Sequence, residues 1–165
     1  IHENNRKRVI RALEYFQSTG QKFSDHNKEE RQKGSPYNFL YLVLTMNREV
    51  LYERIDKRVD QMMEEGLVKE VKELLDAGYS RNLVSMQGLG YKEIASALFK
   101  ECTMEEAVYR LKRDTRHFAK RQMTWFRRER DVTMIDKDNF LNNHEIVNYI
   151  MKLAAEKGIC SCREG

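Results

Sequence analysis

The sequence is poor in cysteine, proline and long apolar runs, and each shortage excludes a class of protein. Three cysteines are an odd number, which argues against a disulfide framework and favours a reducing compartment. One proline and eight glycines leave little room for long irregular loops. No apolar run approaches the roughly 18 residues of a membrane span, and no signal-peptide pattern opens the chain. We therefore expect a cytoplasmic protein with no membrane association.

What remains is a polar, helix-forming composition. Hydrophobic residues make up 41% and charged residues 34% of 165 residues, enough for one domain with its own core. Cys160 and Cys162 form a C-x-C pair near the end, but no second cysteine pair or nearby histidine pair accompanies them. Zinc sites need about four such ligands, so we expect no metal site in this chain. The sequence assigns these two cysteines no role.

Positive charge is concentrated between Arg110 and Arg130. This stretch holds nine Lys or Arg and two acidic residues, whereas the whole chain carries a net charge of only +4. No acidic residue lies between Thr115 and Arg128, so pairs one helical turn apart cannot neutralise the cations. A polyanion such as a nucleic acid explains the stretch better than a solvated helix face or a membrane surface does.

Apolar residues in the same stretch recur every three or four positions, which predicts one long helix, 109–130, with a buried face. We expect Leu111, Phe118 and Trp125 to belong to that buried stripe. Four cations are then predicted on the opposite side, facing a partner; they are Arg113, Arg116, Lys120 and Arg127.

The other periodicities predict a mainly helical chain with two short strands. Segment 38–46 is predicted to be a strand; it is apolar on both alternating faces and should be buried on both sides. Segment 132–136 is the second predicted strand and is short. Two strands alone do not form a stable sheet, so we expect either strands outside this chain or another pairing partner. The predicted helices are 1–19 (capped by Asn4 or Asn5), 48–65 (capped by Asn47), 67–77, 92–99 and 143–156, with a polar connector at 21–36.

Two smaller groups of residues also suggest anion binding. The cations between Arg6 and Arg11 stand in the first turns of a helix, where they are unfavourable unless an anion docks there. Arg54 and Arg58 lie one helical turn apart after the buried strand, where they could clamp a diphosphate or pair with Glu53 or Asp56.

Three segments in this order resemble the tRNA dimethylallyltransferases: IHENNRKRVIRALE, SMQGLGYKEI and RHFAKRQMTWFR. The resemblance runs from Ile1 to about Met151, with departures at His2–Asn5, where the family has HPND, and at His117–Phe118. It implies transfer of a dimethylallyl group from dimethylallyl diphosphate to the exocyclic amine of the adenine 3′ of the anticodon. It also implies an α/β fold like that of P-loop nucleoside kinases, with a helical insertion that grips the anticodon stem-loop.

The family's phosphate-binding GxxxxGK[ST] loop and its acidic general base have no counterpart here. The resemblance therefore implies that this chain is the C-terminal half of the enzyme, inactive alone, with Mg²⁺ held mainly by the N-terminal P-loop half. Within it we expect the end of the insertion and a connector at 1–36, part of the α/β core at 37–158 and a tail at 159–165. The complete enzyme is expected to be a monomer.

The resemblance also assigns site residues. Arg58 matches the arginine beside the diphosphate, with Arg54 as the alternative on the same face. Tyr91, Trp125 and Phe126 are candidates for stacking on unstacked bases, although core packing is favoured for Trp125. A non-catalytic helical RNA-binding module is the alternative function. The implied tRNA contacts are Lys7, Arg8, Val9, Ile10, Arg11, Gln87, Gly88, Leu89, Gly90, Tyr91, Lys92, Arg116, Lys120, Arg121, Gln122, Met123, Thr124, Trp125, Phe126 and Arg127.

Overall fold

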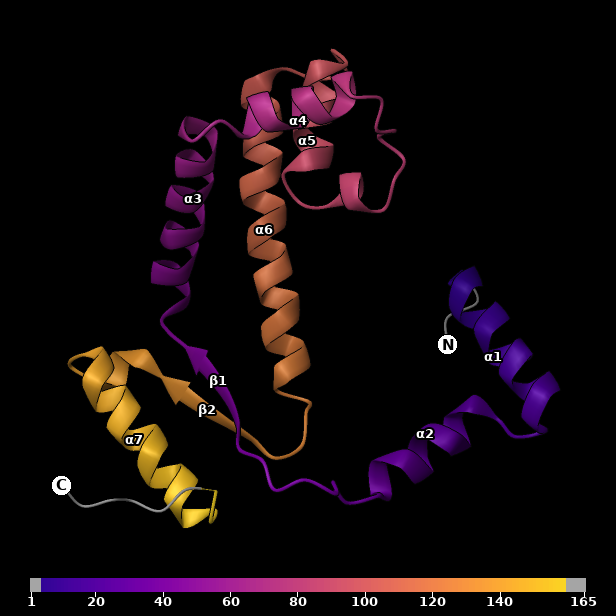
Figure 1. The fold of residues 1–165 in the computed structure, drawn as a ribbon, viewed down its shortest axis with the longest axis vertical. Helices are drawn as coiled ribbons and strands as arrows, with labels where there is room; N and C mark the ends of the chain where they lie inside the picture. The colour runs from indigo at the N-terminus through magenta and orange to yellow at the C-terminus, as the bar shows by residue number, and fades with distance from the viewer. Residues whose placement is uncertain (1–3, 160–165) are drawn as a thin grey trace. The chain divides into compact units, whose positions relative to one another are not determined.

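The computed structural model describes residues 4–159, so Cys160, Cys162 and most of the predicted tail lie outside the described part. It is mainly α-helical with two short strands, as expected from the sequence (Figure 1). The helices are α1 (Arg6–Thr19), α2 (Phe23–Gln32), α3 (Arg48–Glu64), α4 (Leu67–Asp76), α5 (Tyr91–Leu98), α6 (Met104–Phe126) and α7 (Asn143–Glu156). The strands are β1 (Tyr41–Thr45) and β2 (Val132–Asp136), and the short 3-10 helices are η1 (Ser85–Gln87) and η2 (Lys137–Asn139).

The chain divides into two compact units, Ile1–Phe39 and Leu40–Gly165. In the first, Asn5 caps α1 by accepting a hydrogen bond from Arg8 N at 3.3 Å, and Gly20 ends the helix with φ 70°. The predicted polar connector at 21–36 is wrong in part, because α2 forms there. The ring of Tyr15 packs against Phe23 and His26, which gives this otherwise polar segment an apolar contact to fold against.

In the second unit, β1 pairs in parallel with β2, from Tyr41 opposite Val132 to Thr45 opposite Asp136. Within the described part of the chain the sheet has only these two strands. Val43 is buried, but Leu44 is 52% exposed, so the expected burial of both strand faces is wrong for this chain. No further strand covers Leu44 in residues 4–159.

The main core lies where α3, α4, α5 and α6 meet. Figure 1 shows α3 and α6 side by side, with α4 and α5 packed around the beginning of α6. The largest fully buried side chains of this core are Val71, Ile94 and Leu111. Each of the three comes from a different helix, so the core fixes α4, α5 and α6 against one another.

The predicted apolar stripe of α6 is buried only in its first half. Leu111 is 2% exposed, whereas Phe118 and Trp125 are 43% and 54% exposed, so their expected burial is wrong. The reason is that the core formed with α4 and α5 ends before these positions are reached. The second half of α6 therefore presents aromatic as well as cationic side chains.

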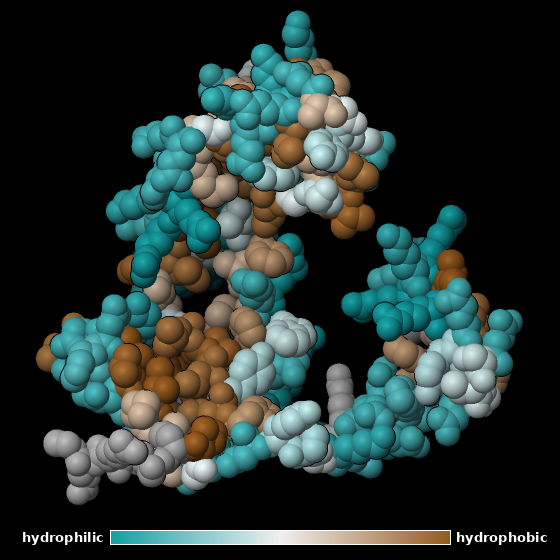
Figure 2. All heavy atoms as spheres, in the orientation of Figure 1, coloured by the Kyte–Doolittle hydropathy of each residue, from teal (hydrophilic) through white to brown (hydrophobic). Residues whose placement is uncertain are grey.

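Apolar side chains also gather on the visible face over the two strands and α7 (Figure 2). Exposed apolar residues of these elements include Leu44, Met134 and Val147. A surface of this kind is larger than single scattered apolar residues and is typical of a protein interface.

Replacing Leu111 by alanine tests the core. We expect Leu111→Ala to lower the free energy of unfolding of the chain by about 2–5 kcal/mol, because the side chain is almost fully buried and its loss leaves a cavity in the core. Phe118→Ala on the same helix should cost about 1 kcal/mol or less, because that ring is already half in solvent. Urea denaturation followed by circular dichroism measures both; equal losses would contradict the described packing of α6.

Candidate functional site

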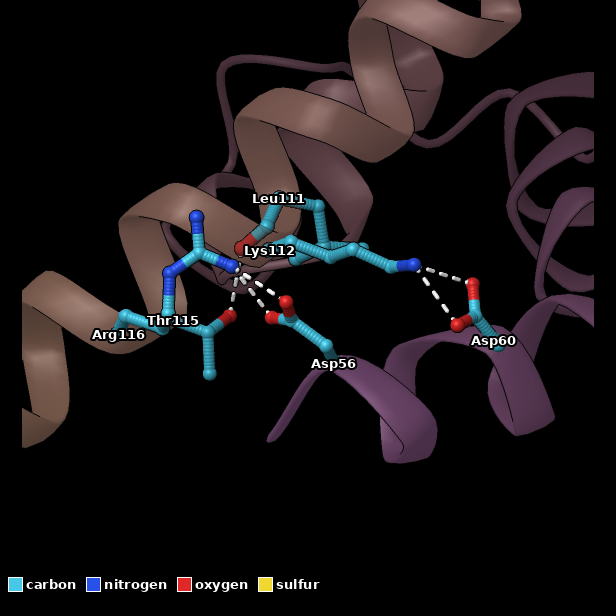
Figure 3. Close-up of polar contacts among 6 residues, drawn as sticks. All are labelled: Asp56, Asp60, Leu111, Lys112, Thr115 and Arg116. Carbon is cyan, nitrogen blue, oxygen red and sulfur yellow. Dashed lines mark hydrogen bonds and ion pairs between the residues drawn. The ribbon is translucent and has the colours of Figure 1, made fainter. Parts of the chain in front are cut away.

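The site is built on two ion pairs that join α3 to α6 (Figure 3). Arg116 Nη1 donates to both carboxylate oxygens of Asp56, at 2.5 and 2.7 Å. One turn away, Lys112 Nζ lies 2.6 and 2.7 Å from the carboxylate oxygens of Asp60. Because the sequence numbers rise on α3 as they fall on α6, the two helices run antiparallel, and the pairs fix their register.

This arrangement corrects two expectations. Arg116 does not face an open surface: its side chain is 24% exposed and bound to Asp56. Asp56 in turn pairs with Arg116, and not with Arg54 or Arg58 as their spacing on α3 would allow. Sequence spacing could not reveal this pairing, because Asp56 and Arg116 are 60 residues apart.

Arg54 and Arg58 line one hollow of about 740 Å³ at the carboxyl end of the strands. Lys137, the residue after β2, contributes a third cation. Both arginines are exposed, and neither forms an ion pair within residues 4–159. The remaining lining residues are Leu44, Met46, Leu51, Ile55, Gln61, Met62 and Glu65.

A hydrogen bond joins the N-terminal cap of α3 to η2 at this edge: Asp138 Oδ2 accepts from Asn47 N at 2.7 Å. Phosphates bind at such carboxyl edges of parallel strands in α/β folds. Lys137 was missed in the sequence, although its position directly after a predicted strand was a usable signal.

Lys120 and Arg127 line a second, smaller hollow of about 200 Å³ between α6 and the start of α3. Met123 and Thr124, also predicted for RNA contact, belong to the same lining. Both cations are exposed and neither forms an ion pair among the described residues. Met46 and Leu51 line this hollow and the larger one, so the two hollows are neighbours.

The glycine-containing loop before α5 is partly occupied by internal bonds. Gly90 has φ 100°, a conformation that favours glycine, and its N–H donates to Glu93 Oε2 at 2.9 Å. The Tyr91 hydroxyl donates to Glu70, and this hydrogen bond raises the pKa of Tyr91. Tyr91 is therefore bound to α4 and is not a free stacking platform in this structure, whereas the side chain of Lys92 remains accessible at 41% exposure.

Lys92 lines a third hollow, of about 550 Å³, with Gln87 and with Arg110 and Arg113 of α6. Arg113 Nε donates to Asp114 at 2.8 Å, which raises the pKa of Arg113 and lowers that of Asp114. The cationic character of this region is therefore partly neutralised within the chain.

The aromatic candidates on α6 differ from one another. Phe126 is half-buried and meets Tyr41 of β1 edge to face, with ring centroids 6.4 Å apart. Trp125 contacts Phe126 but leaves half of its surface in solvent. Of the two, Trp125 is thus the ring available for stacking, contrary to the expectation. Arg121 and Gln122 are exposed, and the Arg121 guanidinium lies over the Phe118 ring.

The predicted contact group at Lys7–Arg11 belongs to the first unit. Lys7 and Arg8 are exposed, while Arg11 lies 6.0 Å from the Phe23 ring centroid. Val9 is half-buried and Ile10 exposed. The group therefore offers mainly its first cations to a partner.

Residues 4–159 contain neither a metal-binding cluster nor a membrane-spanning helix. No three His, Cys, Asp or Glu side chains within residues 4–159 are placed to hold a metal ion. No helix in the same part of the chain is long and apolar enough to cross a membrane.

The described residues thus place cationic hollows at the carboxyl edge of the strands and along α6. In a comparison with known protein families, residues 1–129 match the family model "IPP transferase", and the chain belongs to that family. It is 57% identical to a tRNA dimethylallyltransferase of Lachnoclostridium phytofermentans and 50% identical to one of Acetivibrio thermocellus, over 96% of this chain in each case. The chain spans about half the length of these relatives, 51% of each.

Solved structures agree with this assignment. A full-length tRNA isopentenylpyrophosphate transferase of Bacillus halodurans matches 96% of this chain at a TM-score of 0.70 and 46% identity, over 48% of its own length. A eukaryotic dimethylallyltransferase described as acting on tRNA matches 99% of this chain at a TM-score of 0.76 and 26% identity, over 44% of its length. The resemblance inferred from the three sequence segments is confirmed.

A double-mutant cycle on Asp56 and Arg116 tests the ion-pair seam. We expect a coupling energy of about 1 kcal/mol or more between Asp56→Asn and Arg116→Gln, because the pair is partly buried and carries two hydrogen bonds. The exposed pair Glu106–Arg110 within α6 is the matched control and should couple by only about 0.3–0.5 kcal/mol. Denaturant titration measures both cycles. Equal coupling energies in the two cycles would contradict a stabilising role of the Asp56–Arg116 ion pair between α3 and α6.

Proposed function

We propose that this chain forms the tRNA- and diphosphate-contacting half of a tRNA dimethylallyltransferase. The complete enzyme would transfer the dimethylallyl group of dimethylallyl diphosphate to the exocyclic amine of the adenine 3′ of the anticodon. The observation that carries the proposal is the pair of neighbouring cationic hollows with the shared apolar residues Met46 and Leu51. Two anionic substrates and an apolar group passing between them fit this arrangement.

The larger hollow fits the diphosphate. When the adenine amine attacks the first carbon of the prenyl group, the bond from that carbon to the diphosphate oxygen breaks and negative charge grows on the leaving group. Arg58 can chelate two of its oxygens, and Arg54 and Lys137 are close enough to share the charge. The proton lost from the amine goes to a base, which the family resemblance assigns to the half that this sequence does not contain.

The second half of α6 fits the tRNA. Lys120, Arg121 and Arg127 are exposed cations on one helix, with Trp125 exposed beside them. Extruding an adenine from its stack costs a few kcal/mol, which contacts around the loop must offset. Phosphate contacts and one accessible aromatic ring are the contacts that such a surface provides.

The remaining expectations concern parts beyond this chain. We propose that the N-terminal P-loop half covers the apolar surface over β1, β2 and α7, where Leu44 is half in solvent. A Mg²⁺ ion finds no fitting ligand cluster among residues 4–159, so its binding would depend on other residues. A monomeric, cytoplasmic enzyme remains our prediction.

The alternative is a non-catalytic RNA-binding module. The basic helix alone would suit both functions. A pure RNA-binding module has no need for Arg54, Arg58 and Lys137 to converge at the strand edge, and this convergence favours the enzyme.

Arg58→Ala in the complete enzyme tests the diphosphate site. We expect kcat/KM for the prenyl donor to fall by about 10²–10³, the typical loss for one preorganised charge contact. Affinity for tRNA should change by no more than about twofold, because Arg58 lines the other hollow. Arg54→Ala is the comparison: if it causes the larger loss, Arg54 is the principal ligand. Equal losses for donor and tRNA would contradict a diphosphate role.

Salt dependence tests the RNA surface. Each phosphate that the protein neutralises contributes roughly −0.7 to −0.9 to the slope of log affinity against log salt. Replacing Lys120 and Arg127 together by alanine should flatten the slope for an anticodon stem-loop by about one to two units. Lys57→Ala, an exposed lysine of α3 that lines neither hollow, should leave it unchanged. A slope unaffected by the double change would mean that these cations face only water.

A further inference from the structure

The hollow of about 200 Å³ has a wall that the sequence did not suggest. One side comes from α6, including Lys120 and Arg127, and the other comes from Arg48 and Tyr52 at the beginning of α3. The Arg48 guanidinium lies over the Tyr52 ring, 5.2 Å from its centroid, which orients the arginine by a cation–π contact. Three cations from two helices thus surround one small hollow.

The antiparallel register of α3 against α6 explains why cations without acidic partners gather at the smaller hollow. Moving toward the start of α3 one turn at a time, the residues are Asp60, Asp56, Tyr52 and Arg48. The first two meet Lys112 and Arg116 in ion pairs. At the next two steps α6 offers Lys120 and then Thr124, with Arg127 directly after the helix, whereas Tyr52 and Arg48 of α3 are not acids. The alternation of opposite charges stops where the hollow begins.

Three cations converging without an acid are unfavourable unless an anion neutralises them. Arg48, Lys120 and Arg127 form no ion pair within residues 4–159. Tyr52, Leu51 and Met123 add apolar surface to the same lining. A phosphate joined to a ribose or base matches this combination, since the phosphate meets the cations and the flat group lies against the ring.

The smaller hollow lies beside the proposed diphosphate site, and this location indicates which ligand it binds. Met46 and Leu51 line both hollows, so a group bound here lies next to the proposed prenyl donor. The acceptor adenine of the proposed reaction must approach that donor closely. An RNA strand brought to this point would therefore pass through the smaller hollow.

We propose that this hollow binds one backbone phosphate of the tRNA anticodon loop through Arg48, Lys120 and Arg127, with the adjoining nucleoside against Tyr52. The inference rests on the proposed function and adds Arg48 and Tyr52 to the RNA-binding surface. Arg48 can make two hydrogen bonds to a phosphate, which fixes the strand's position better than a point charge does.

The test uses the complete enzyme and a synthetic anticodon stem-loop. Arg48→Ala should weaken stem-loop binding about tenfold and flatten the salt slope by about 0.7–0.9, the contribution of one phosphate. Arg48→Lys keeps the charge, so it should restore the slope while recovering only part of the affinity. Tyr52→Leu should weaken binding without changing the slope, because it removes a ring and no charge. KM for the prenyl donor should stay within about twofold in all three variants.

The matched control is Lys57→Ala, which removes one exposed positive charge from the same helix outside both hollows. If Arg48→Ala and Lys57→Ala alter stem-loop affinity and slope equally, the proposal is wrong. It is also wrong if Arg48→Ala and Arg48→Lys lower the melting temperature but leave the slope intact, since Arg48 would then stabilise the fold without neutralising an RNA phosphate. Failure of the proposed function is a separate result, because wild-type enzyme would then transfer no prenyl group to tRNA.

Discussion

The antiparallel register of α3 against α6 is the constraint on which the site depends. Asp56–Arg116 and Asp60–Lys112 fix this register, and the apolar contacts of Leu111 and Val59 lie in the core nearby. Because the register is fixed, the first turns of α3 always face the second half of α6. The cations left over on both helices then converge, and the arginines on the adjoining face of α3 reach the carboxyl edge of the strands.

The contact with α3 divides the cations of the basic helix α6 into two groups. Its cations are not a single row facing outward. Lys112 and Arg116 are structural, because acids on α3 neutralise them, whereas Lys120 and Arg127 stand where those acids have ended. Ion-paired cations and cations without an acidic partner among the described residues thus occupy different parts of one helix, and this division is visible only when the partner helix is in place.

Local signals predicted much of the fold. Asn5 and Asn47 cap helices as expected, α7 has the predicted bounds, and 132–136 is a strand. Helix α2 was missed because its residues are almost entirely polar, and its apolar contact comes from Tyr15 of another helix. The exposure of Trp125 and the pairing of Arg116 depend on which other elements pack against α6. Sequence periodicity shows which residues share a helix face, but not what packs against that face. Spacing pointed to Arg54 and Arg58 together, and the family resemblance favoured Arg58. Arg48 and Lys137 were recognised from the hollows that they line.

The most direct measurement is a crystal structure of the complete enzyme with an anticodon stem-loop and an unreactive analogue of dimethylallyl diphosphate. The account predicts the diphosphate beside Arg54 and Arg58, and a loop phosphate beside Lys120 and Arg127, with Met46 and Leu51 next to the prenyl group. RNA bound on another face of α6, or a diphosphate with no contact to either arginine, would contradict it.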